Sequence, residues 1–462
     1  MAEASLLEKL SLQEIVKAVD GKMEGAESAD PDILSVSTDT RKISPGSLFI
    51  PIKGERFDGH DFIEAAYAAG AAAVLSEIPV SGHECVVTVS DTRKAYLDLA
   101  SYYRRRFPVT VVGVTGSVGK TTTKEMIADV LESQYHTLKT EGNLNNEIGL
   151  PATLLQLDSS YRAAVIEMGM SAFGEISRLS RCAAPNISVI TNIGESHIEY
   201  LGSREGILKA KLEILDGMDS HAPLILNADN DLLAGVINDL AREMIYYGID
   251  NPNAEIRAID IVEQNMTTKF DILYYGKTIH AVIPTVGKHN VLNALAAFTV
   301  GFVLDIAPEQ IVEALSRYVP SGMRQKIVNS HGIIFIEDCY NASPDSMKAS
   351  IGVLSSVSCT GKRIAVLADM LELGEHSAEA HERVGRMVAQ SNADMLYCFG
   401  KQSKNMLYAA QQCGMKDAYW FDDKNRMARE IRKNIATGDC ILFKGSRGMR
   451  LEEVIYQIYR ES

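Results

Sequence analysis

Short apolar runs alternate with segments of helical periodicity along most of the chain. In the middle part these runs lie at Thr110–Val114, Ala163–Met168, Ile187–Ile193 and Pro223–Asn227. Strands that alternate with helices in this way are typical of a parallel α/β sheet. Residues 256–284 differ, because alternating apolar and polar runs follow one another there and predict an antiparallel meander.

The pattern continues on both sides of this middle part. Before it, the chain predicts a helix at Leu10–Val19 and short strands at Leu34–Val36, Ser47–Ile52 and Ala71–Leu75. After Pro320, strands alternate with helices in a Rossmann-like arrangement, at Gly332–Glu337, Arg363–Ala368, Asp394–Phe399 and Cys440–Phe443. A chain of 462 residues is too long for one core. We therefore predict an α/β protein of three domains, which span residues 1–106, 107–319 and 320–462.

The composition disfavours several classes of protein. The net charge of −14 argues against a nucleic-acid partner, whose binding surface would be basic. Seven cysteines are scattered without a Cys-x-x-Cys pair, which indicates reduced intracellular thiols rather than disulfides or a zinc site. No signal pattern opens the chain, and the longest apolar stretch, Val291–Leu304, is too short to span a membrane. We expect a cytoplasmic protein.

Residues 108–124 form the most informative motif. A β-branched apolar run leads into closely spaced glycines, then Lys120, then a helix-like segment. Strand, loop and helix in this order indicate a phosphate-binding loop, whose N–H groups face phosphate oxygens. Lys120 would reach the β- and γ-phosphates, and the Thr121 hydroxyl would bind Mg²⁺. The predicted nucleotide-binding residues are Gly116, Ser117, Val118, Gly119, Lys120, Thr121 and Thr122.

One position in this motif is irregular, because Val114 stands where the usual first glycine is expected. Gly113, Gly116 and Gly119 have the threefold spacing of a dinucleotide-binding turn, which is the alternative. A lysine followed by three threonines has no role in such a turn, so the pattern favours a nucleoside triphosphate. No Asn-Lys-x-Asp motif is present, which disfavours a GTPase switch.

Glu167 lies at the end of the predicted strand in 163–168, and His197 follows the next predicted strand, Ile187–Ile193. A glutamate at a strand end is often only ion-paired, and a lone histidine is usually structural. Beside a phosphate loop, however, Glu167 becomes a candidate Mg²⁺ ligand. His197 would lie at the carboxyl edge of the parallel sheet, where α/β proteins bind ligands.

Three further segments are rich in polar residues. Thr140–Pro151 contains three asparagines and ends in proline, which predicts a loop rather than a helix. Lys209 and Lys211 lie in a helical stretch, where lysines ordinarily form a solvated face. Gly287 precedes a helix whose first residues are polar, so that Asn290 either reads an adenine edge or simply caps the helix.

Nine segments together resemble the Mur ligases, ATP-dependent enzymes that add amino acids to the peptidoglycan precursor. They are Val114–Thr122, Gly142–Pro151, Glu167–Met170, Asn192–His197, Ala210–Ile214, Gly287–Ala294, Asp338–Met347, Leu367–Gly374 and Phe443–Arg447. Within the family the chain is similar to the MurF type, which joins D-alanyl-D-alanine to UDP-N-acetylmuramoyl-tripeptide. The resemblance covers essentially the whole length.

The resemblance implies a mechanism and a set of site residues. ATP would phosphorylate the tripeptide carboxylate, and the amine of D-alanyl-D-alanine would attack the acyl phosphate. Lys120, Glu167, His197 and Lys211 would be catalytic. Two Mg²⁺ ions would be bound by Thr121, Glu167, His197 and a Lys211 carbamylated by CO₂. The other implied ATP contacts are His289, Asn290, Arg324, Asp338, Tyr340 and Asn341. The implied substrate contacts are Ser37, Thr38, Asp39, Thr40, Arg41, Phe57, Asp58, Gly59, His60, Asn143, Asn145 and Asn146.

Three residues depart from the family's pattern: Val118, Ser196 and Ser343, none of which removes a charged or metal-binding group. Two other functions remain open. One is a nucleotide-driven switch, and the other is a folylpolyglutamate-type or cyanophycin-type ligase acting on another acid. The default oligomeric state for such a chain is a monomer.

Overall fold

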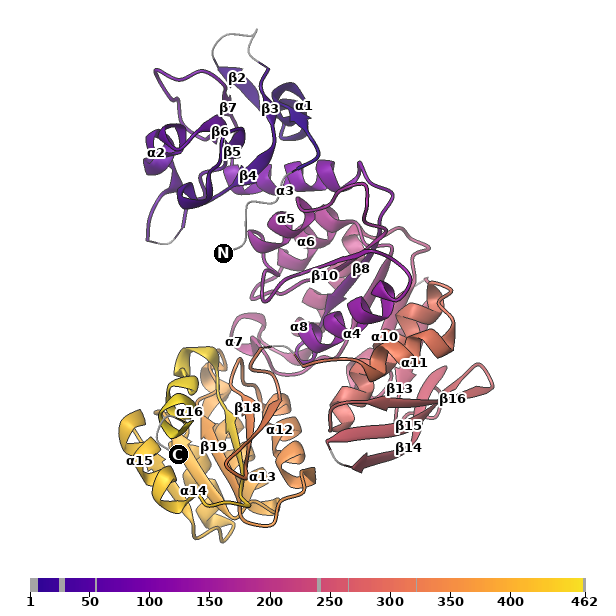
Figure 1. Cartoon of the computed structure of the whole chain (residues 1–462), viewed down its shortest axis with the longest axis vertical. Coiled ribbons are helices and arrows are strands. Elements are labelled where there is room, and N and C mark those ends of the chain that lie inside the picture. Colours follow the sequence, from indigo (N-terminus) through magenta and orange to yellow (C-terminus); the bar gives the residue numbers. More distant parts are fainter. Residues whose placement is uncertain are drawn as a thin grey trace. The chain divides into compact units, whose positions relative to one another are not determined.

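The computed structural model describes residues 7–24, 30–54, 56–238, 242–264, 266–320 and 322–459. Their contacts form two compact units. The first contains Met1–Thr115, Gln134–Val189 and Leu212–Pro223, and the second contains Gly116–Ser133, Ile190–Lys211 and Leu224–Ser462. Figure 1 shows the strands and helices along the chain.

The N-terminal part of the first unit is built on a five-stranded sheet in the order β2-β7-β6-β5-β4. Phe49, Ile63, Ala66 and Val74 form a core between this sheet and a short helix. The elements are β1 (Leu10–Ser11), α1 (Leu12–Ala18), β2 (Lys22–Glu24), β3 (Asp32–Ile33), β4 (Ser35–Ser37), β5 (Ser47–Phe49), α2 (Ile63–Ala68), β6 (Ala71–Ser76), β7 (Val86–Thr88) and α3 (Thr92–Arg104). The predicted α/β character of this region is therefore seen in the structure.

A larger sheet of nine strands has the order β16-β15-β14-β13-β12-β11-β8-β10-β9. Its strands in the first unit are β8 (Thr110–Thr115), β9 (Thr137–Lys139), β10 (Ala163–Glu167) and most of β11 (Ile187–Ile190). The helices of this unit beside them are α5 (Gly149–Leu154) and α6 (Glu175–Ala183). β10 pairs in parallel with both β8 and β9, as the short apolar runs predicted.

The second unit contains the other strands of this sheet and the helix that follows the phosphate loop. The strands are β12 (Leu224–Asn227), β13 (Met244–Gly248), β14 (Ile256–Gln264), β15 (Thr267–Tyr274) and β16 (Lys277–Ile283). The helices are α4 (Lys120–Glu132), α7 (Ile198–Leu201), α8 (Arg204–Leu212), α9 (Asp231–Ala234), α10 (Lys288–Val303) and α11 (Pro308–Ser316). The predicted meander is confirmed, because β14, β15 and β16 pair antiparallel.

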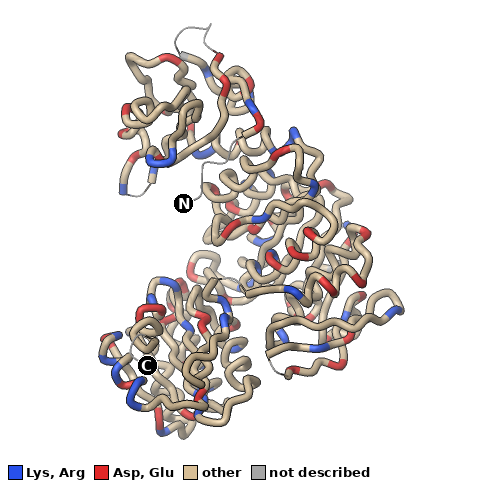
Figure 2. The backbone as a smooth tube through the Cα atoms, viewed as in Figure 1, with Lys and Arg blue, Asp and Glu red and all other residues tan. Residues whose placement is uncertain are grey.

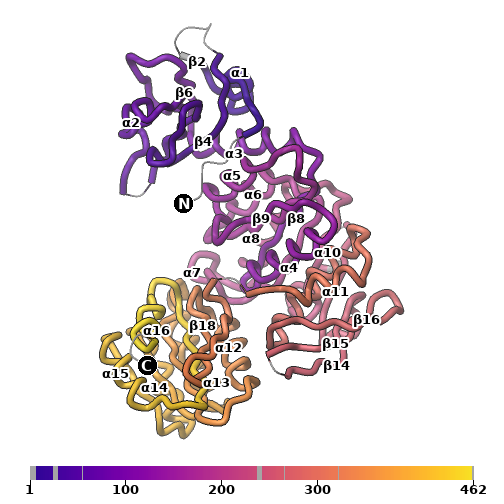
Figure 3. Tube along the Cα trace, viewed as in Figure 1, coloured from indigo at the N-terminus to yellow at the C-terminus, as the bar shows by residue number. Residues whose placement is uncertain are grey.

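A six-stranded sheet, also in the second unit, has the order β17-β18-β22-β19-β20-β21. Its strands are β17 (Lys326–Ser330), β18 (Ile333–Asp338), β19 (Arg363–Ala368), β20 (Met395–Phe399), β21 (Ala418–Phe421) and β22 (Cys440–Lys444). The helices are α12 (Pro344–Ser356), α13 (Ser377–Gln390), α14 (Lys404–Gln412), α15 (Lys424–Asn434) and α16 (Glu452–Tyr459). Among the described strands of this sheet, only β17 runs antiparallel to its neighbour. Figure 3 shows these residues, orange to yellow, as one cluster.

Two sequence predictions need correction. The segment Thr140–Pro151 is not entirely a loop, since α5 begins at Gly149 and contains Pro151 in its first turn. Proline is compatible with that position because the first N–H groups of a helix have no intrahelical partner. Lys211 does not belong to a solvated face, because its side chain is buried, whereas Lys209 is exposed as expected.

Charged residues of both signs occur throughout the sequence. Figure 2 shows Lys and Arg interspersed with Asp and Glu along the chain. Within the described ranges, no helix combines the length and apolar character needed to cross a membrane.

Candidate active site

The predicted phosphate loop connects β8 to α4 and is shaped by backbone contacts. Gly116 and Gly119 have positive φ angles of 150° and 83°. A Cβ at Gly116 would lie 1.9 Å from Thr191 Oγ1, so a side chain cannot be accommodated there. Val114, in contrast, is an ordinary β8 residue opposite Glu167. The irregular first glycine is thus explained, since that position needs no special backbone conformation.

Asn192 supports this loop from the strand end after β11. Its Oδ1 atom accepts hydrogen bonds from the N–H groups of Ser117 (3.1 Å) and Val118 (2.8 Å). The loop is further held by Ser196, whose hydroxyl donates to the Ser117 carbonyl at 3.4 Å. Sequence reasoning did not assign a role to Asn192, although it lies inside one of the motifs that carry the resemblance.

The two predicted catalytic lysines, Lys120 and Lys211, both lie in the second unit. Lys120, the first residue of α4, donates from Nζ to the Gly116 carbonyl at 2.8 Å. Lys211 is 2% exposed on α8. Burial, reinforced by the positive charge of Lys120, holds the pKa of Lys211 well below the usual lysine value. Thr121 is buried near the start of α4, and Thr122 follows it in the same helix.

Glu167 occupies the predicted position at the end of β10 and is 1% exposed. Asn145 donates from Nδ2 to Glu167 Oε1 at 2.8 Å, while the Glu167 N–H donates to Thr140 Oγ1 at 3.0 Å. Asn146 has a different role, because its Oδ1 accepts from the N–H groups that begin α5. Asn143 is exposed. The asparagine-rich segment therefore holds a buried carboxylate as well as starting a helix.

His197 precedes α7 with a left-handed φ of 64°. Its Nδ1 lies 2.6 Å from Oε2 of Glu372, a residue of the segment after β19. The close contact with His197 lowers the pKa of Glu372, against the opposing effect of partial burial. Arg383 of α13 also pairs with Glu195, two residues before His197. Neither Glu372 nor Arg383 was singled out from the sequence.

His289 and Asn290, the predicted contacts of the adenine, lie in the first turn of α10. Asn290 is buried and donates to the carbonyl of Val286 at 2.9 Å and to Gln325 Oε1 at 2.7 Å. It does not cap α10, since these contacts use its amide as a donor. His289 contacts the same Gln325 oxygen at 2.8 Å, and burial lowers the pKa of His289.

The predicted ATP contacts after residue 320 fall into two groups. The Arg324 guanidinium lies over the Tyr340 ring, 4.1 Å from its centroid. Asp338 instead pairs with Lys444 at 2.8 Å and accepts a hydrogen bond from Ser350. Burial works to raise the pKa of Asp338, but Lys444 and Ser350 overcome it and the net shift is downward. Asn341 is exposed, and its carbonyl accepts from Lys444 at 3.1 Å.

The implied substrate contacts at residues 37–41 and 57–60, both in the first unit, each lie in a local turn. Asp39 begins a 3-10 helix at Thr40–Lys42 and binds Arg41, which lowers the pKa of Asp39 to about 2. Asp58 begins another at Gly59–Phe62 and contacts His60 Nδ1 at 2.6 Å. Ser37 donates to the Asp39 carbonyl, and Phe57 is 64% exposed. Thr38 and Thr40 are half-buried.

Comparison with known proteins identifies the family. Residues 32–109 match the Mur ligase family, catalytic domain; residues 114–301 match the Mur ligase middle domain; and residues 323–447 match the Mur ligase, glutamate ligase domain. A Bacillus subtilis (strain 168) protein named UDP-N-acetylmuramoyl-tripeptide–D-alanyl-D-alanine ligase is 42% identical over 97% of this chain and 98% of its own length.

The chain belongs to the Mur ligase family.

Other Mur ligases support the same assignment. The Escherichia coli (strain K12) protein of the same name is 36% identical over 96% of this chain and 97% of its own length. A crystal structure of MurF from Acinetobacter baumannii has a TM-score of 0.92 at 29% identity, covering 98% of this chain and all of that one. MurF from Thermotoga maritima in complex with ADP has a TM-score of 0.84 at 28% identity, covering 92% and 97%. The predicted three-domain α/β Mur ligase fold and ligase class are confirmed.

The three departures from the family's pattern have structural explanations in this Mur ligase. Val118 donates its backbone N–H to Asn192 Oδ1, a hydrogen bond that a polar residue at this position could also form. Ser196 adds the bond to Ser117. Ser343 is the N-cap of α12 and forms a reciprocal pair of hydrogen bonds with Ser346. The substitutions therefore leave the loop and the helix start intact.

The side chains of Glu167, Thr121 and His197 carry atoms that can bind a metal ion. Among the described residues, no three His, Cys, Asp or Glu side chains gather into a ready-made metal site. The carboxylate of Glu167 and the hydroxyl of Thr121 are nevertheless oxygen donors of the kind that Mg²⁺ accepts. Because the Glu372 contact uses Nδ1 of His197, Nε2 is the ring nitrogen that could face a metal. The donor chemistry fits Mg²⁺ that is bound partly by protein and partly by substrate phosphate.

Proposed function

We propose that the chain joins D-alanyl-D-alanine to UDP-N-acetylmuramoyl-tripeptide at the expense of ATP. The observation that carries this proposal is the extent of the similarity to the curated relatives with that name, which reaches 42% identity across nearly the whole length. The similarity includes the N-terminal sheet and its two aspartate turns, which a folylpolyglutamate-type ligase would not need. The ADP complex of the Thermotoga maritima relative supports the use of ATP.

The proposed reaction has two steps. An oxygen of the tripeptide carboxylate attacks the γ-phosphorus of ATP, so that an acyl phosphate forms and ADP leaves. The amine of D-alanyl-D-alanine then attacks the acyl carbon, loses a proton and expels inorganic phosphate. Charge spread over the transferring phosphoryl group must be balanced by positive groups already in place. Lys120 and the N–H groups at the start of α4 are suited to this task.

We propose Thr121 and Glu167 as ligands of one Mg²⁺ and His197 as a ligand of a second. Mg²⁺ would neutralise charge on the phosphate oxygens. Support for Glu167 comes from its burial and from the register of β10, which sets it opposite Val114, two residues before Gly116. Support for His197 comes from the Glu372 contact, because an imidazole oriented by a carboxylate is a common metal ligand.

Lys211 is proposed as a carbamate. A neutral amine adds to the carbon of CO₂, forms an N–C bond and loses a proton, which turns the amine into an anionic oxygen ligand. The burial of Lys211 favours the neutral amine, which is the form that reacts with CO₂. The resulting carbamate could then bind a metal ion. The carbamate would serve the second Mg²⁺ together with His197.

The remaining contacts are proposed on the same basis. Residues 1–106 would bind the UDP-sugar through Ser37–Arg41 and Phe57–His60, with the asparagines of 143–146 extending toward the peptide. Residues 107–319 would bind ATP, and residues 320–462 would add Arg324, Tyr340 and Asn341 and receive the dipeptide. We propose a cytoplasmic monomer.

One assay tests the proposal. Phosphate release from ATP is measured with UDP-N-acetylmuramoyl-tripeptide, with and without D-alanyl-D-alanine. We expect release that depends on the dipeptide and a product that contains both substrates. Release that ignores the dipeptide would indicate a nucleotide switch instead. Release with folate and glutamate would favour the folylpolyglutamate-type activity.

A further inference from the structure

Gln325 connects the region before β17 to the start of α10. It is a buried residue with a left-handed φ of 50°, a conformation that non-glycine residues adopt at some cost. Its Oε1 accepts from His289 Nε2 at 2.8 Å and from Asn290 Nδ2 at 2.7 Å. Its Nε2 donates to the Val286 carbonyl at 2.7 Å. The side-chain amide therefore uses both of its ends on residues 286–290.

The backbone of the same residue is tied to the C-terminal sheet. The Gln325 N–H donates to Asp338 Oδ1, at the end of β18, at 3.3 Å. Asp338 is in turn fixed by its buried pair with Lys444. Gln325 thus joins a fixed point on β18 to the first turn of α10.

A chain of buried hydrogen bonds continues from Asn290 to the helix of the phosphate loop. Asn293 Nδ2 donates to Asn290 Oδ1 at 3.2 Å, and Thr123 Oγ1 donates to Asn293 Oδ1 at 3.0 Å. The Thr123 N–H closes the first turn of α4 on the Gly119 carbonyl at 2.8 Å. A Cβ at Gly119 would lie 2.7 Å from Asn293 Oδ1, so the loop and α10 are in close approach. We call Gln325, Asn290, Asn293 and Thr123 the Gln325 relay.

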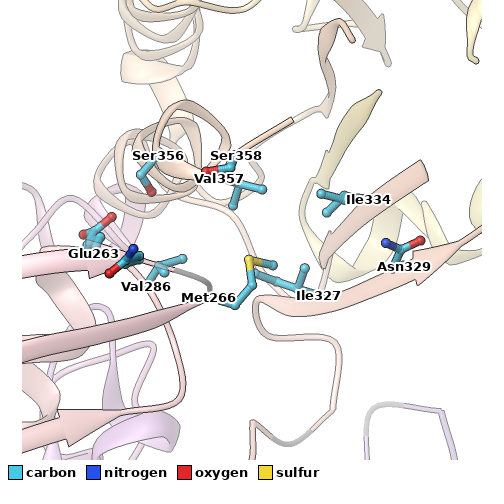
Figure 4. Close-up of a pocket in the computed structure, with 10 residues that line it drawn as sticks. Glu263, Met266, Val286, Ile327, Asn329, Ile334, Ser356, Val357 and Ser358 are labelled. Carbon is cyan, nitrogen blue, oxygen red and sulfur yellow. The ribbon is translucent and has the colours of Figure 1, made fainter. Parts of the chain in front are cut away.

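The segment 286–290 borders a cavity through Val286. This cavity, of about 380 Å³, is lined by Glu263 and Val286 on one side and by Ile327 and Ile334 on another (Figure 4). On the cavity side, Glu263 Oε1 accepts from the Gly287 N–H at 3.0 Å. Hydrogen bonds from Gln325 and Glu263 therefore hold this segment beside the cavity. Buried amides that lose such partners are costly to leave unsatisfied.

We propose that Gln325 is a positioning residue for ATP, which acts through His289 and Asn290 and through the relay to the phosphate loop. The proposal rests on the assignment of ATP to this loop. It deepens that assignment by naming a residue outside the phosphate loop that links β18 to the nucleotide site. Loss of the Gln325 amide would let the start of α10 move and weaken ATP binding without touching the other two substrates.

The test compares Gln325→Met with Gln325→Gly and with Gln310→Met, a matched change at an exposed glutamine of α11. We expect Gln325→Met and Gln325→Gly to weaken ATP binding about tenfold by calorimetry, as for the loss of one or two buried hydrogen bonds. The KM values for the tripeptide and the dipeptide should stay within about twofold, and Gln310→Met should leave all constants unchanged. Gln325→Gly separates the lost amide from backbone strain, because glycine accepts the left-handed conformation.

A double-mutant cycle with Thr123→Val examines the relay itself. If the relay couples the two ends, the combined loss of ATP affinity is smaller than the product of the separate losses. Unchanged ATP affinity in a folded Gln325→Met or Gln325→Gly protein would overturn the proposal, as would an equal loss for all three substrates. ATP binding is measured without tripeptide or dipeptide, so it does not depend on the proposed reaction. Wild-type enzyme that binds ATP but releases phosphate at a rate independent of the dipeptide would contradict the proposed reaction, not the role of Gln325.

Discussion

The Nδ1 atom of His197 lies 2.6 Å from Oε2 of Glu372, and both residues have left-handed backbones, with φ of 64° and 61°. The two segments are far apart in the sequence and come from the regions before α7 and after β19. Such conformations persist in non-glycine residues only when surrounding contacts require them. The contact orients the imidazole and leaves Nε2 as the nitrogen for a ligand.

Replacing Glu372 by glutamine should therefore slow the chemical step. The amide keeps the size of the side chain but loses the charge that orients His197. We expect kcat to fall about tenfold, the low end of effects on metal-ligand partners, while the KM for ATP changes less than about twofold. Steady-state kinetics and Mg²⁺ titration measure the change. Glu375→Gln, at an exposed neighbouring position, is the control. A kcat for Glu372→Gln equal to that of the control would contradict an orienting role.

Asn192 is expected to matter for nucleotide binding. In Asn192→Ala the N–H groups of Ser117 and Val118 lose their common acceptor. We expect the KM for ATP to rise about tenfold, as for the loss of two hydrogen bonds that shape the loop. Asn253→Ala, at an exposed turn position, should leave this constant unchanged. An unaltered KM in a folded Asn192→Ala enzyme would show that the loop is set without this side chain.

Lys211→Ala should abolish most of the ligase activity, and short carboxylic acids should restore part of it. The cavity left by the lysine can admit a small carboxylate in place of the proposed carbamate. Activity of the variant is measured with and without added acetate or formate, and Lys209→Ala serves as the exposed control. Full activity of Lys211→Ala, without any need for an added acid, would refute the carbamate.

The buried pair of Asp338 and Lys444 predicts a pH effect on stability. The folded pKa of Asp338 is lowered, so its ionised form stabilises the fold above about pH 4, and this contribution is lost as the pH falls through the folded pKa. Lys444→Met alone should lower the free energy of unfolding at neutral pH by about 3 kcal/mol, because it leaves a buried carboxylate without its partner.

The double variant Asp338→Asn, Lys444→Met gives the decisive comparison for that pair. It should recover most of the lost stability and depend less on acid between about pH 5 and 3, since no carboxyl remains to titrate. Urea unfolding at several pH values measures both effects. A double variant as unstable as Lys444→Met, or one with the acid dependence of the wild type, would disagree with this assignment.

The sequence predicted local features of the fold well, for a physical reason. β19 has the same bounds as the apolar run Arg363–Ala368, because a buried strand needs consecutive apolar residues. The start of α5 was missed because Pro151 was interpreted as a helix terminator, although Asn146 was available as an acceptor for the first N–H groups. The burial of Lys211 was also missed, since helical periodicity does not show which residues of other segments cover a face.

Some residues of the candidate site could be predicted from the sequence and others could not. Lys120, Glu167 and His197 could be predicted, because Lys120 follows a glycine-rich turn, Glu167 ends an apolar strand and His197 follows another. Glu372, Asn192 and Gln325 could not, because their roles depend on partners 175, 75 and 36 residues away. The left-handed backbones of Glu372 and Gln325 also leave no mark in the sequence, since glutamate and glutamine rarely adopt them.

The central claim is that ATP activates a peptide carboxylate, and an isotope experiment tests it most directly. UDP-N-acetylmuramoyl-tripeptide is labelled with ¹⁸O in the reacting carboxylate and incubated with ATP, Mg²⁺ and D-alanyl-D-alanine, and the released phosphate is analysed by mass spectrometry. An acyl-phosphate route transfers one carboxylate oxygen to each phosphate, so we predict singly labelled phosphate in proportion to product. Unlabelled phosphate, formed at the same rate as product, would contradict the account.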